Sequence, residues 1–481
     1  MSKASTSTFL QFSTCLFLIL VASLTAIAPK GAEATAEAAV SGEFLISLKE
    51  TSEDVISLIE ANNGVILEKI DVINILRVRI EGVSTQTFTE SLRDNPSVLY
   101  VEPNGIVSLP VQVGTEAKAS DAAVTLTPSD TFWFSDPLSG LGQWNMRVVN
   151  AEQAWDVQTG SRSVVVAVLD TGVFRDHSDL KASYMTGGYD WVNNDSNPAD
   201  DHGHGTAVAG IIAAETNNGY GIAGLAQVSV VAEKVLDRSG TGTWANVASG
   251  IIHATDLGAD VISMSFAGHS PSATVKSAVN YAYGKGCLLV AAAGNGNTNT
   301  PSYPAAFDKV LAVAATYGEP DLRAPYSDFG DWITLSAPGG FDANRNGRVD
   351  LGEHWVLSTY GVNNFIYLYG TSLAAPHVSG LAALYKSKYP TATNTQIEAV
   401  LKATADEKGD SGWDQYYGYG RINAYRALTT PPVPLVGGQA ELLQAPDENP
   451  KWTSHTPDPF LVSCSFIAIV AVLLLTVRKN R

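Results

Sequence analysis

The chain reads Tyr369-Gly370-Thr371-Ser372-Leu373-Ala374-Ala375-Pro376-His377-Val378-Ser379-Gly380 at the point that decides its fold. Gly370 permits a sharp backbone reversal, and the dense apolar residues after Ser372 predict a buried helix. The hydroxyl would then lie at a helix N-terminus, where backbone N–H groups and the dipole favour negative charge. An acyl-transfer enzyme needs its nucleophile in such a place, because the tetrahedral intermediate carries an oxyanion. A serine that only caps a helix gives the same local pattern, so the rest of the chain must decide between the two.

Two further blocks lie upstream, and they read Val166-Ala167-Val168-Leu169-Asp170-Thr171-Gly172-Val173 and His202-Gly203-His204-Gly205-Thr206-Ala207-Val208-Ala209-Gly210. Together with the serine block they resemble the aspartate, histidine and serine signatures of the subtilisin-like serine proteases, with Leu373 where methionine is usual. The order Asp, His, Ser along the chain is the order found in subtilisin. The resemblance covers roughly residues 42 to 430.

The resemblance implies a catalytic triad and an oxyanion hole. Asp170 ends an expected strand and would orient His204, which would act as the base toward Ser372. We assign the base to His204 because the Gly-Thr after it begins a helix of small residues, whereas His202 is expected in the loop. Asn295 follows the run Ala291-Ala292-Ala293-Gly294 and would donate an amide N–H to the oxyanion, with the Ser372 backbone N–H as the second donor. An asparagine in a turn after a strand is the structural alternative.

The substrate is expected to lie extended and to pair with two strand edges, residues 239–242 and 265–268. Glycines suit such edges because a second backbone must approach closely. The substrate-binding residues implied by the resemblance are Gly240, Thr241, Gly242, Ser265, Phe266, Ala267 and Gly294. Phe266 and Ala267 depart from the common Leu-Gly, which leaves the pocket shape open. No acidic cluster there requires a basic substrate residue, so we expect broad specificity.

Composition and charge restrict the class of protein. The chain has 481 residues, of which 45% are hydrophobic and 16% charged, as in a globular chain of two or three domains. A net charge of -18 argues against nucleic acid or anionic lipid as a partner. Of the three cysteines only Cys287 lies in the globular part, so no disulfide can form within it. A secreted protein without disulfides needs another stabilising cross-link, and a bound metal ion can supply one.

Residues 342–353 fit the calcium-loop pattern D-x-[DN]-x-[DN]-G-x5-E at every position. The predicted oxygen ligands are Asp342, Asn344, Asn346, the Arg348 carbonyl, Asp350 and Glu353. The flanking segments 335–338 and 355–357 look like strands, so the loop would not form a helix-loop-helix hand; a solvated turn is the alternative. The family resemblance alone implies a second calcium site, with ligands from Asp179, Thr216, Asn218, Tyr220, Ile222 and Asp136.

Both ends of the chain carry apolar runs. Residues 1–34 are typical of a secretory signal, with a buried helix as the alternative. Residues 431–459 form an extended linker, and residues 460–477 are an uncharged apolar run of about 27 Å as a helix, enough to span a hydrocarbon core. The basic tail 478–481 would stay inside, which places a membrane-anchored protease outside the cell. A core helix, or a sorting signal that is cut off, is the alternative.

The segment 42–110 alternates strand and helix patterns as β-α-β/β-α-β and resembles the inhibitory propeptide of the same family, an α+β ferredoxin-like unit. We expect it to inhibit the protease with its C-terminal tail, although an independent accessory domain is possible. Residues 111–129 are expected to form a linker exposed to proteolysis, and autoprocessing is expected at a bond within the range 109–131 that the sequence does not fix.

Residues 130–430 alternate strand and helix and predict a parallel sheet with helices on both faces. Strands are expected at 163–169, 228–235, 261–266, 288–292 and 310–314, and helices at 204–214, 245–257 and 272–284. The sequence therefore predicts a monomeric, calcium-stabilised serine endopeptidase that is made as a zymogen and cleaves proteins or peptides. The alternative is an inactive subtilisin-like module that binds partners at a cell surface.

Overall fold

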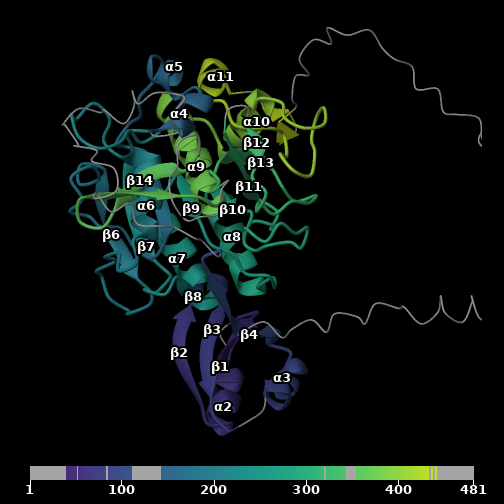
Figure 1. Cartoon of the computed structure of the whole chain (residues 1–481). Helices are drawn as coiled ribbons and strands as arrows, with labels where there is room; N and C mark the ends of the chain where they lie inside the picture. Colours follow the sequence, from purple (N-terminus) through teal and green to yellow (C-terminus); the bar gives the residue numbers. More distant parts are fainter. Residues whose placement is uncertain are drawn as a thin grey trace, which may run out of the picture. The chain divides into compact units, whose positions relative to one another are not determined.

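The computed structural model describes residues 39–50, 53–82, 85–110, 142–318, 321–342, 354–432, 435–436 and 439–440. All of them belong to one compact unit, Met1–Ala440. Figure 1 colours this unit from the purple N-terminal domain to the teal and green domain that carries the serine block. The expected signal, the linker 111–129, the anchor and the basic tail lie outside the described residues, as do most of the linker 431–459 and most of the predicted calcium loop. Among the described residues, no helix is both long and apolar enough to cross a membrane.

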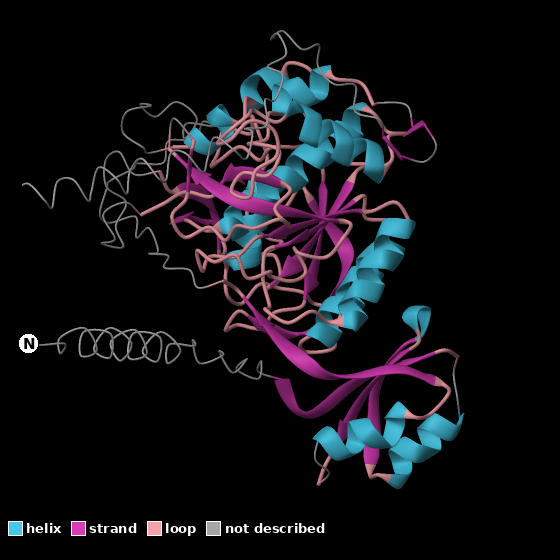
Figure 2. Ribbon diagram, turned by 90° about the vertical axis from the view of Figure 1, so that its right-hand side faces the viewer, coloured by secondary structure: helices cyan, strands magenta, loops and turns pink. Residues whose placement is uncertain are grey.

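The N-terminal domain has the predicted β-α-β/β-α-β order. Its elements are β1 (Ala39–Leu48), α2 (Glu53–Ala61), β2 (Gly64–Ile70), a 3-10 turn η1 (Asp71–Ile73), β3 (Ile75–Ile80), α3 (Thr85–Arg93) and β4 (Val98–Ser108). The strands form an antiparallel sheet in the order β2-β3-β1-β4, with both helices on one face (Figure 2). Strand β1 begins at Ala39, three residues before the expected boundary, because it is longer than the apolar run at its centre.

Side chains alternate between the two faces of this sheet. Phe44 and Ile46 point into a small core with Phe88 and Leu92 beneath the two helices. Leu45, between them, belongs instead to a core that contains residues of the next domain. One face of the sheet therefore packs on its own helices and the other on the second domain.

The second domain is built on an eight-stranded sheet. Its strands lie in the order β12-β11-β10-β9-β5-β7-β6, with β13 beside β11. They are β5 (Val165–Asp170), β6 (Tyr184–Asp190), β7 (Ser229–Lys234), β9 (Val261–Met264), β10 (Leu288–Ala292), β11 (Val310–Tyr317), β12 (Leu322–Arg323) and β13 (Leu335–Pro338). All neighbours are parallel except β11 and β12. The sequence prediction of a parallel sheet is confirmed, and the expected strand limits hold within a few residues.

Helices cover both sides of this sheet (Figure 2). They are α4 (Trp144–Val148), α5 (Ala151–Trp155), α6 (His204–Ala213), α7 (Trp244–Asp256), α8 (Ala273–Gly284), α9 (Thr371–Lys388), α10 (Asn394–Thr404) and α11 (Ala424–Thr429). A hairpin of β14 (Val356–Tyr360) and β15 (Asn364–Leu368) packs on α6, and two short strands, β16 (Leu435–Val436) and β17 (Gln439–Ala440), pair near the end of the unit. Strands β5, β9 and β10 are buried throughout or nearly so, which explains their continuous apolar sequences.

Candidate active site

Asp170 and His204 form a buried hydrogen-bonded pair. Asp170 is the last residue of β5, and its Oδ1 lies 2.7 Å from His204 Nδ1. His204 is the first residue of α6, so a rigid strand end and a rigid helix start hold the two side chains. Gly205 allows this approach, because a Cβ there would lie 2.1 Å from the Gly172 carbonyl oxygen. The Gly after the histidine in the predicted block is thus needed to bring α6 against β5.

Ser372 lies at the neighbouring strand end, in the first turn of α9. Ser265, immediately after β9, donates from Oγ to the Ser372 carbonyl at 2.9 Å. Strand β9 is the parallel neighbour of β5, and α9 packs against α6. The Asp170–His204 pair and the helix start that bears Ser372 therefore lie at the carboxyl ends of the adjacent strands β5 and β9, the edge at which open parallel sheets bind ligands.

Thr371 fixes the side chain of Asn295. The Asn295 Oδ1 atom accepts from the Thr371 backbone N–H at 2.9 Å and from Thr371 Oγ1 at 2.8 Å. Thr371 Oγ1 in turn accepts from the Gly294 N–H at 3.0 Å. Because the amide oxygen is engaged twice, the Asn295 NH2 group is the part left to donate to a ligand. The loop needs glycine at 294, where φ is +111° and a Cβ would lie 2.1 Å from Asp328 Oδ2.

A second buried histidine, His377, lies one turn further along α9. Its Nδ1 contacts the Leu373 carbonyl at 2.7 Å and its Nε2 contacts Asn145 Nδ2 at 2.8 Å. Burial lowers the pKa of His377 to about 4. This imidazole stays neutral and has both nitrogens engaged, so it is unsuited to the role of a base.

Asp200 and Lys234 support the site, and the sequence analysis did not single them out. Asp200 accepts hydrogen bonds from the Thr171 hydroxyl and from the backbone N–H groups of Gly203 and Thr206, at 2.8 to 2.9 Å. It thereby ties the turn after Asp170 to the start of α6. Lys234, buried at the end of β7, donates to the Thr171 carbonyl at 2.7 Å and to Asp201 at 2.6 Å. No short motif marks either residue, because their partners lie far away in the chain.

The end of the N-terminal domain lies between the two predicted substrate-binding edges. Strand β4 pairs antiparallel with β8 (Thr241–Thr243), with Val107 opposite Gly242. Ser108 exchanges two backbone hydrogen bonds with Ala267, and the Leu109 N–H donates to the Gly240 carbonyl at 2.9 Å. Glycine at 240 leaves room for this residue, since a Cβ would lie 2.7 Å from Leu109 Cδ1. The segment 106–109 therefore lies as an extended peptide between the two edges at which substrate is predicted to bind.

Comparison with known proteins agrees with this arrangement. The profile of the subtilase family matches residues 161–420, more than half of the chain. The chain belongs to the subtilase family. Thermitase from Thermoactinomyces vulgaris is 43% identical over 295 residues, which are 61% of this chain and 98% of thermitase. A thermophilic serine proteinase from Bacillus sp. strain AK1 is 39% identical over 74% of this chain and 78% of its own length. This subtilase is accordingly a serine endopeptidase.

The N-terminal domain also has a known counterpart. Residues 27–104 match the profile of the fervidolysin N-terminal prodomain. The crystal structure of fervidolysin from Fervidobacterium pennivorans, a keratinolytic enzyme related to subtilisin, superposes with a TM-score of 0.70 at 26% identity. The superposition covers 83% of this chain and 62% of that one. The ferredoxin-like unit of this subtilase is therefore a prodomain.

The prodomain contacts the starts of two helices of the catalytic domain. Glu102 accepts from the Ala273 and Thr274 N–H groups at the start of α8, at 2.9 and 3.0 Å. The Asn104 side-chain oxygen accepts from the Ala245 N–H at the start of α7, at 3.1 Å. Figure 1 shows α7 and α8 on the side of the catalytic domain that faces β4. These contacts satisfy helix-terminal donors that would otherwise need a solvent partner.

The predicted calcium ligands of this subtilase are only partly described. Asp179 Oδ1 accepts from Asn218 Nδ2 at 2.7 Å, and Asp179 Oδ2 accepts from the Ile222 N–H at 2.8 Å. Thr216 and Tyr220 lie in the same loop, whereas Asp136 is outside the described residues. Of the 342–353 loop only Asp342 is described, and it is buried. Within the described ranges, no group of three or more His, Cys, Asp or Glu side chains could hold a metal ion. Carbonyl and amide oxygens would therefore have to complete a site at Asp179.

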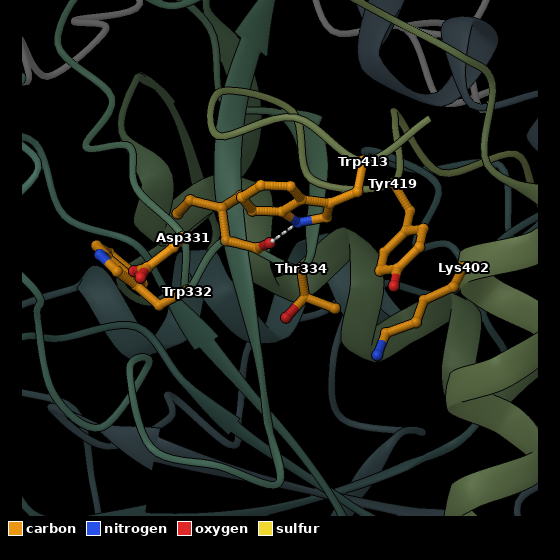
Figure 3. Close-up of a pocket in the computed structure, with 7 residues that line it drawn as sticks. Asp331, Trp332, Thr334, Lys402, Trp413 and Tyr419 are labelled. Carbon is orange, nitrogen blue, oxygen red and sulfur yellow. Dashed lines mark hydrogen bonds between the residues drawn. The ribbon is translucent and has the colours of Figure 1, made fainter. Parts of the chain in front are cut away.

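A pocket of about 380 Å³ lies away from these residues, before the start of β13 (Figure 3). It is lined by Asp331, Trp332, Ile333, Thr334, Lys402, Trp413 and Tyr419. The Trp413 indole donates to the Ile333 carbonyl at 2.8 Å, which fixes one wall. The lining includes no residue of the predicted active site.

Proposed function

We propose that this subtilase is a secreted, calcium-stabilised endopeptidase in which Ser372 is the nucleophile, His204 the base, Asp170 its orienting carboxylate and Asn295 an oxyanion donor. The observation that carries the proposal is the 2.7 Å Asp170–His204 pair beside the helix start that bears Ser372. The rigid strand and helix ends give the pre-organisation that such chemistry needs.

The proposed reaction follows from these positions. His204 accepts the Ser372 proton as Oγ attacks the substrate carbonyl carbon, and Asp170 stabilises the imidazolium without taking its proton. The Asn295 NH2 group and the Ser372 N–H stabilise the oxyanion. His204 then protonates the leaving amine, and water hydrolyses the acyl-enzyme. The substrate-binding residues Gly240, Thr241, Gly242, Ser265, Phe266, Ala267 and Gly294 would hold the peptide between the edges that the prodomain tail now occupies.

The prodomain is proposed to inhibit the enzyme within the same chain until it is cut off. Support comes from the tail itself, since residues 106–109 occupy both edges of the cleft. The proposed domains are prodomain 42–110, processing region 111–129 and peptidase 130–430. Residues 1–34 would direct secretion, and residues 460–477 with the tail 478–481 would anchor a monomer after the linker 431–459. One matched relative, at 37% identity, is the minor extracellular protease Epr of Bacillus subtilis.

Calcium is proposed at two loops. Asp179, the Asn218 side chain and the carbonyls of Thr216, Tyr220 and Ile222 would hold one ion, with Asp136 as a further ligand. The contacts of Asp179 with Asn218 and Ile222 already close this loop, which supports the fit. Asp342, Asn344, Asn346, Arg348, Asp350 and Glu353 would hold the other. A bound ion would cross-link each loop and stabilise a fold that lacks a disulfide among its described residues.

The test is the full chain with Ser372→Ala beside the unchanged protein. The unchanged protein should lose its prodomain and label with a fluorophosphonate probe at Ser372, whereas the variant should do neither. Labelling that persists in the variant, or prodomain removal at the normal rate, would contradict the assigned nucleophile. A folded, prodomain-free protein that takes no label would instead indicate an inactive binding module.

A further inference from the structure

The backbone register of the prodomain tail identifies the residue that lies at the reaction centre. Ser108 and Ala267 form an antiparallel pair and exchange both backbone hydrogen bonds. In an antiparallel ladder such pairs recur two residues further along each strand, in opposite directions. Residue 110 therefore lies opposite Ser265. Because Ser265 Oγ is 2.9 Å from the Ser372 carbonyl oxygen, residue 110 is the tail residue beside the nucleophile.

The side chains of the tail agree with this register. Val107 is 1% exposed and belongs to the same apolar core as Phe266 and Trp244. Leu109 packs on that core and lies over Gly240, whereas Ser108, between them, is exposed. Alternate residues thus fill the cleft and face solvent, as in an extended substrate. The bond between residues 110 and 111 is the one in position for attack.

Residue 110 is a proline, which is poorly suited to that position. The ladder requires an N–H at residue 110 to donate to the Ser265 carbonyl, and proline has none. The ring also holds φ near about −65°, whereas an antiparallel strand prefers about −140°. The hydrogen bonds at Ser108 and Leu109 still hold the tail in the cleft. The tail therefore has the contacts that bind a substrate but lacks a contact beside the bond to be cut.

We propose that Pro110 is a built-in brake on maturation: it lets the tail occupy the cleft as a substrate but slows cleavage of the Pro110–Val111 bond. This inference rests on the proposed role of Ser372. Contacts that stabilise the bound tail and the transition state equally strengthen binding of the tail but do not accelerate its cleavage, so the tail inhibits the enzyme. The prodomain consequently acts first as an inhibitor and only slowly as a substrate.

The retarded step is ordinary acyl transfer. Ser372 Oγ bonds to the Pro110 carbonyl carbon while its proton passes to His204. The C–N bond to Val111 then breaks, and the nitrogen leaves as an amine with that proton. Water replaces Ser372 on the acyl carbon, which yields a Pro110 carboxylate and a new N-terminus at Val111.

The experiment compares full-length chains with Pro110→Ala, which restores the N–H, against the unchanged protein. Intact mass spectrometry follows loss of the prodomain with time and identifies the new N-terminus. Pro110→Ala should release a Val111 N-terminus about tenfold faster or more, because one transition-state hydrogen bond and the strand conformation are regained. Pro103→Ala is the matched control, since Pro103 is an exposed proline of the same strand, opposite Phe44 and away from the cleft. It should mature at the unchanged rate.

A second measurement does not depend on folding of the variant. Mature enzyme is given synthetic peptides with the sequence of residues 104–115, carrying either Pro or Ala at position 110. The Ala peptide should be cut between 110 and 111 with a kcat higher by about tenfold or more and a similar KM. Equal rates for the two peptides would contradict the proposal that Pro110 slows cleavage. Cleavage of the Ala peptide at another bond would contradict the register. Ser372→Ala separates the hypotheses: if that variant matures normally, the proposed nucleophile is wrong, whatever Pro110 does.

Discussion

At the scale of single residues, the orientation of Asn295 depends on one neighbour. Thr371 donates twice to the Asn295 amide oxygen, from its backbone and from its hydroxyl. Without the Thr371 hydroxyl, the hydrogen bond from the Thr371 backbone N–H would be the only one of the two left, and the Asn295 amide could rotate about it. The hydroxyl also accepts from Gly294 and so joins both sides of the loop. We infer that Thr371 positions the oxyanion donor without touching the substrate itself.

Thr371→Val should therefore lower kcat by up to about tenfold, because the lost hydrogen bond from the hydroxyl to Asn295 contributes about 0.5–1.5 kcal/mol. KM should change little, since the donor acts on the transition state. Thr371→Ser keeps the hydroxyl and is the control, with kcat near that of the unchanged enzyme. Steady-state hydrolysis of a peptide substrate measures both constants. A rise in KM with kcat unchanged would mean that Thr371 serves binding instead.

At the scale of elements, a hydrogen-bonded pair of the buried Glu233 and the half-buried His253 joins β7 to α7. Glu233 Oε1 lies 2.7 Å from His253 Nδ1, and Glu233 Oε2 accepts from the Trp191 indole at 2.7 Å. The hydrogen bond from Glu233 raises the pKa of His253 above its ordinary 6.5, and burial raises the pKa of Glu233. Both groups thus bind protons more tightly in the folded chain than in the unfolded one. The stabilisation from His253 is complete below pH 6.5 and is lost as the pH rises through its raised pKa.

This pair predicts that thermal stability falls from neutral to alkaline pH. In a Ser372→Ala background, which prevents self-digestion, the Tm should fall as His253 loses its proton, because the folded chain binds that proton more tightly than the unfolded chain does. Glu233→Gln should flatten this part of the profile. Asp256→Asn, which removes an exposed carboxylate that also favours the protonated His253, should flatten it much less. An unchanged slope in Glu233→Gln would show that the pH dependence has another source.

The loop from Thr216 to Ile222 predicts a response to chelation. Its closure depends on Asp179, which contacts both the Asn218 amide and the Ile222 N–H. An ion bound only by the folded loop stabilises it by about 2.7 kcal/mol at a hundredfold excess over Kd. EDTA should therefore lower the Tm of the Ser372→Ala protein by several degrees, and calcium should restore it where magnesium does not. Asp179→Asn should reduce this response; a Tm indifferent to EDTA would remove calcium from the proposal.

The limits of sequence-based prediction are also visible at this scale. The positions of Asp170 at a strand end, and of His204 and Ser372 at helix starts, were predictable because each lies in a short block whose own strand or helix fixes its place. The limits of strand β2 were not predictable, although the β-α-β/β-α-β order implies a strand there, because Val65 and Leu67 are exposed and obscure the alternation of polar and apolar residues. Strand β6 contains Gly187 and Gly188, which have low strand propensity; Gly188 is needed because a Cβ there would lie 1.9 Å from the Ala232 carbonyl oxygen of β7.

Contacts between distant parts of the chain could not be predicted from local sequence patterns. Asp200 resembles any loop carboxylate until the fold brings Thr171 and Gly203 to it. The position of Pro110 depends on a strand register between two domains, which no motif of either domain determines. The cleft edges were predicted from resemblance, and the structure places the tail of the prodomain between them.

At the scale of the whole molecule, the prodomain and the catalytic domain are joined by buried polar contacts as well as by the tail. Glu43 is almost fully buried and bonds to Arg79, Arg77 and Asn104. These bonds outweigh the opposing effect of burial and lower the pKa of Glu43. Asn104 continues the network to the start of α7. The prodomain thus presents an ordered set of acceptors to the two helix starts.

Among these acceptors, Glu102 makes the most hydrogen bonds to the catalytic domain. Its carboxylate accepts from the Ser272 hydroxyl at 2.8 Å and from two backbone N–H groups at the positive end of α8. Hydrogen bonds to a charged group contribute about 1.5–3 kcal/mol, so Glu102→Ala should raise the Ki of the separated prodomain by about 10- to 100-fold. The prodomain has its own apolar core and can be added to mature enzyme while peptide hydrolysis is followed. Glu60→Ala, at an exposed position of α2, is the control and should leave Ki unchanged. Equal Ki values for the Glu102 and Glu60 variants would mean that the tail alone holds the prodomain, and that the helix starts contribute nothing to inhibition.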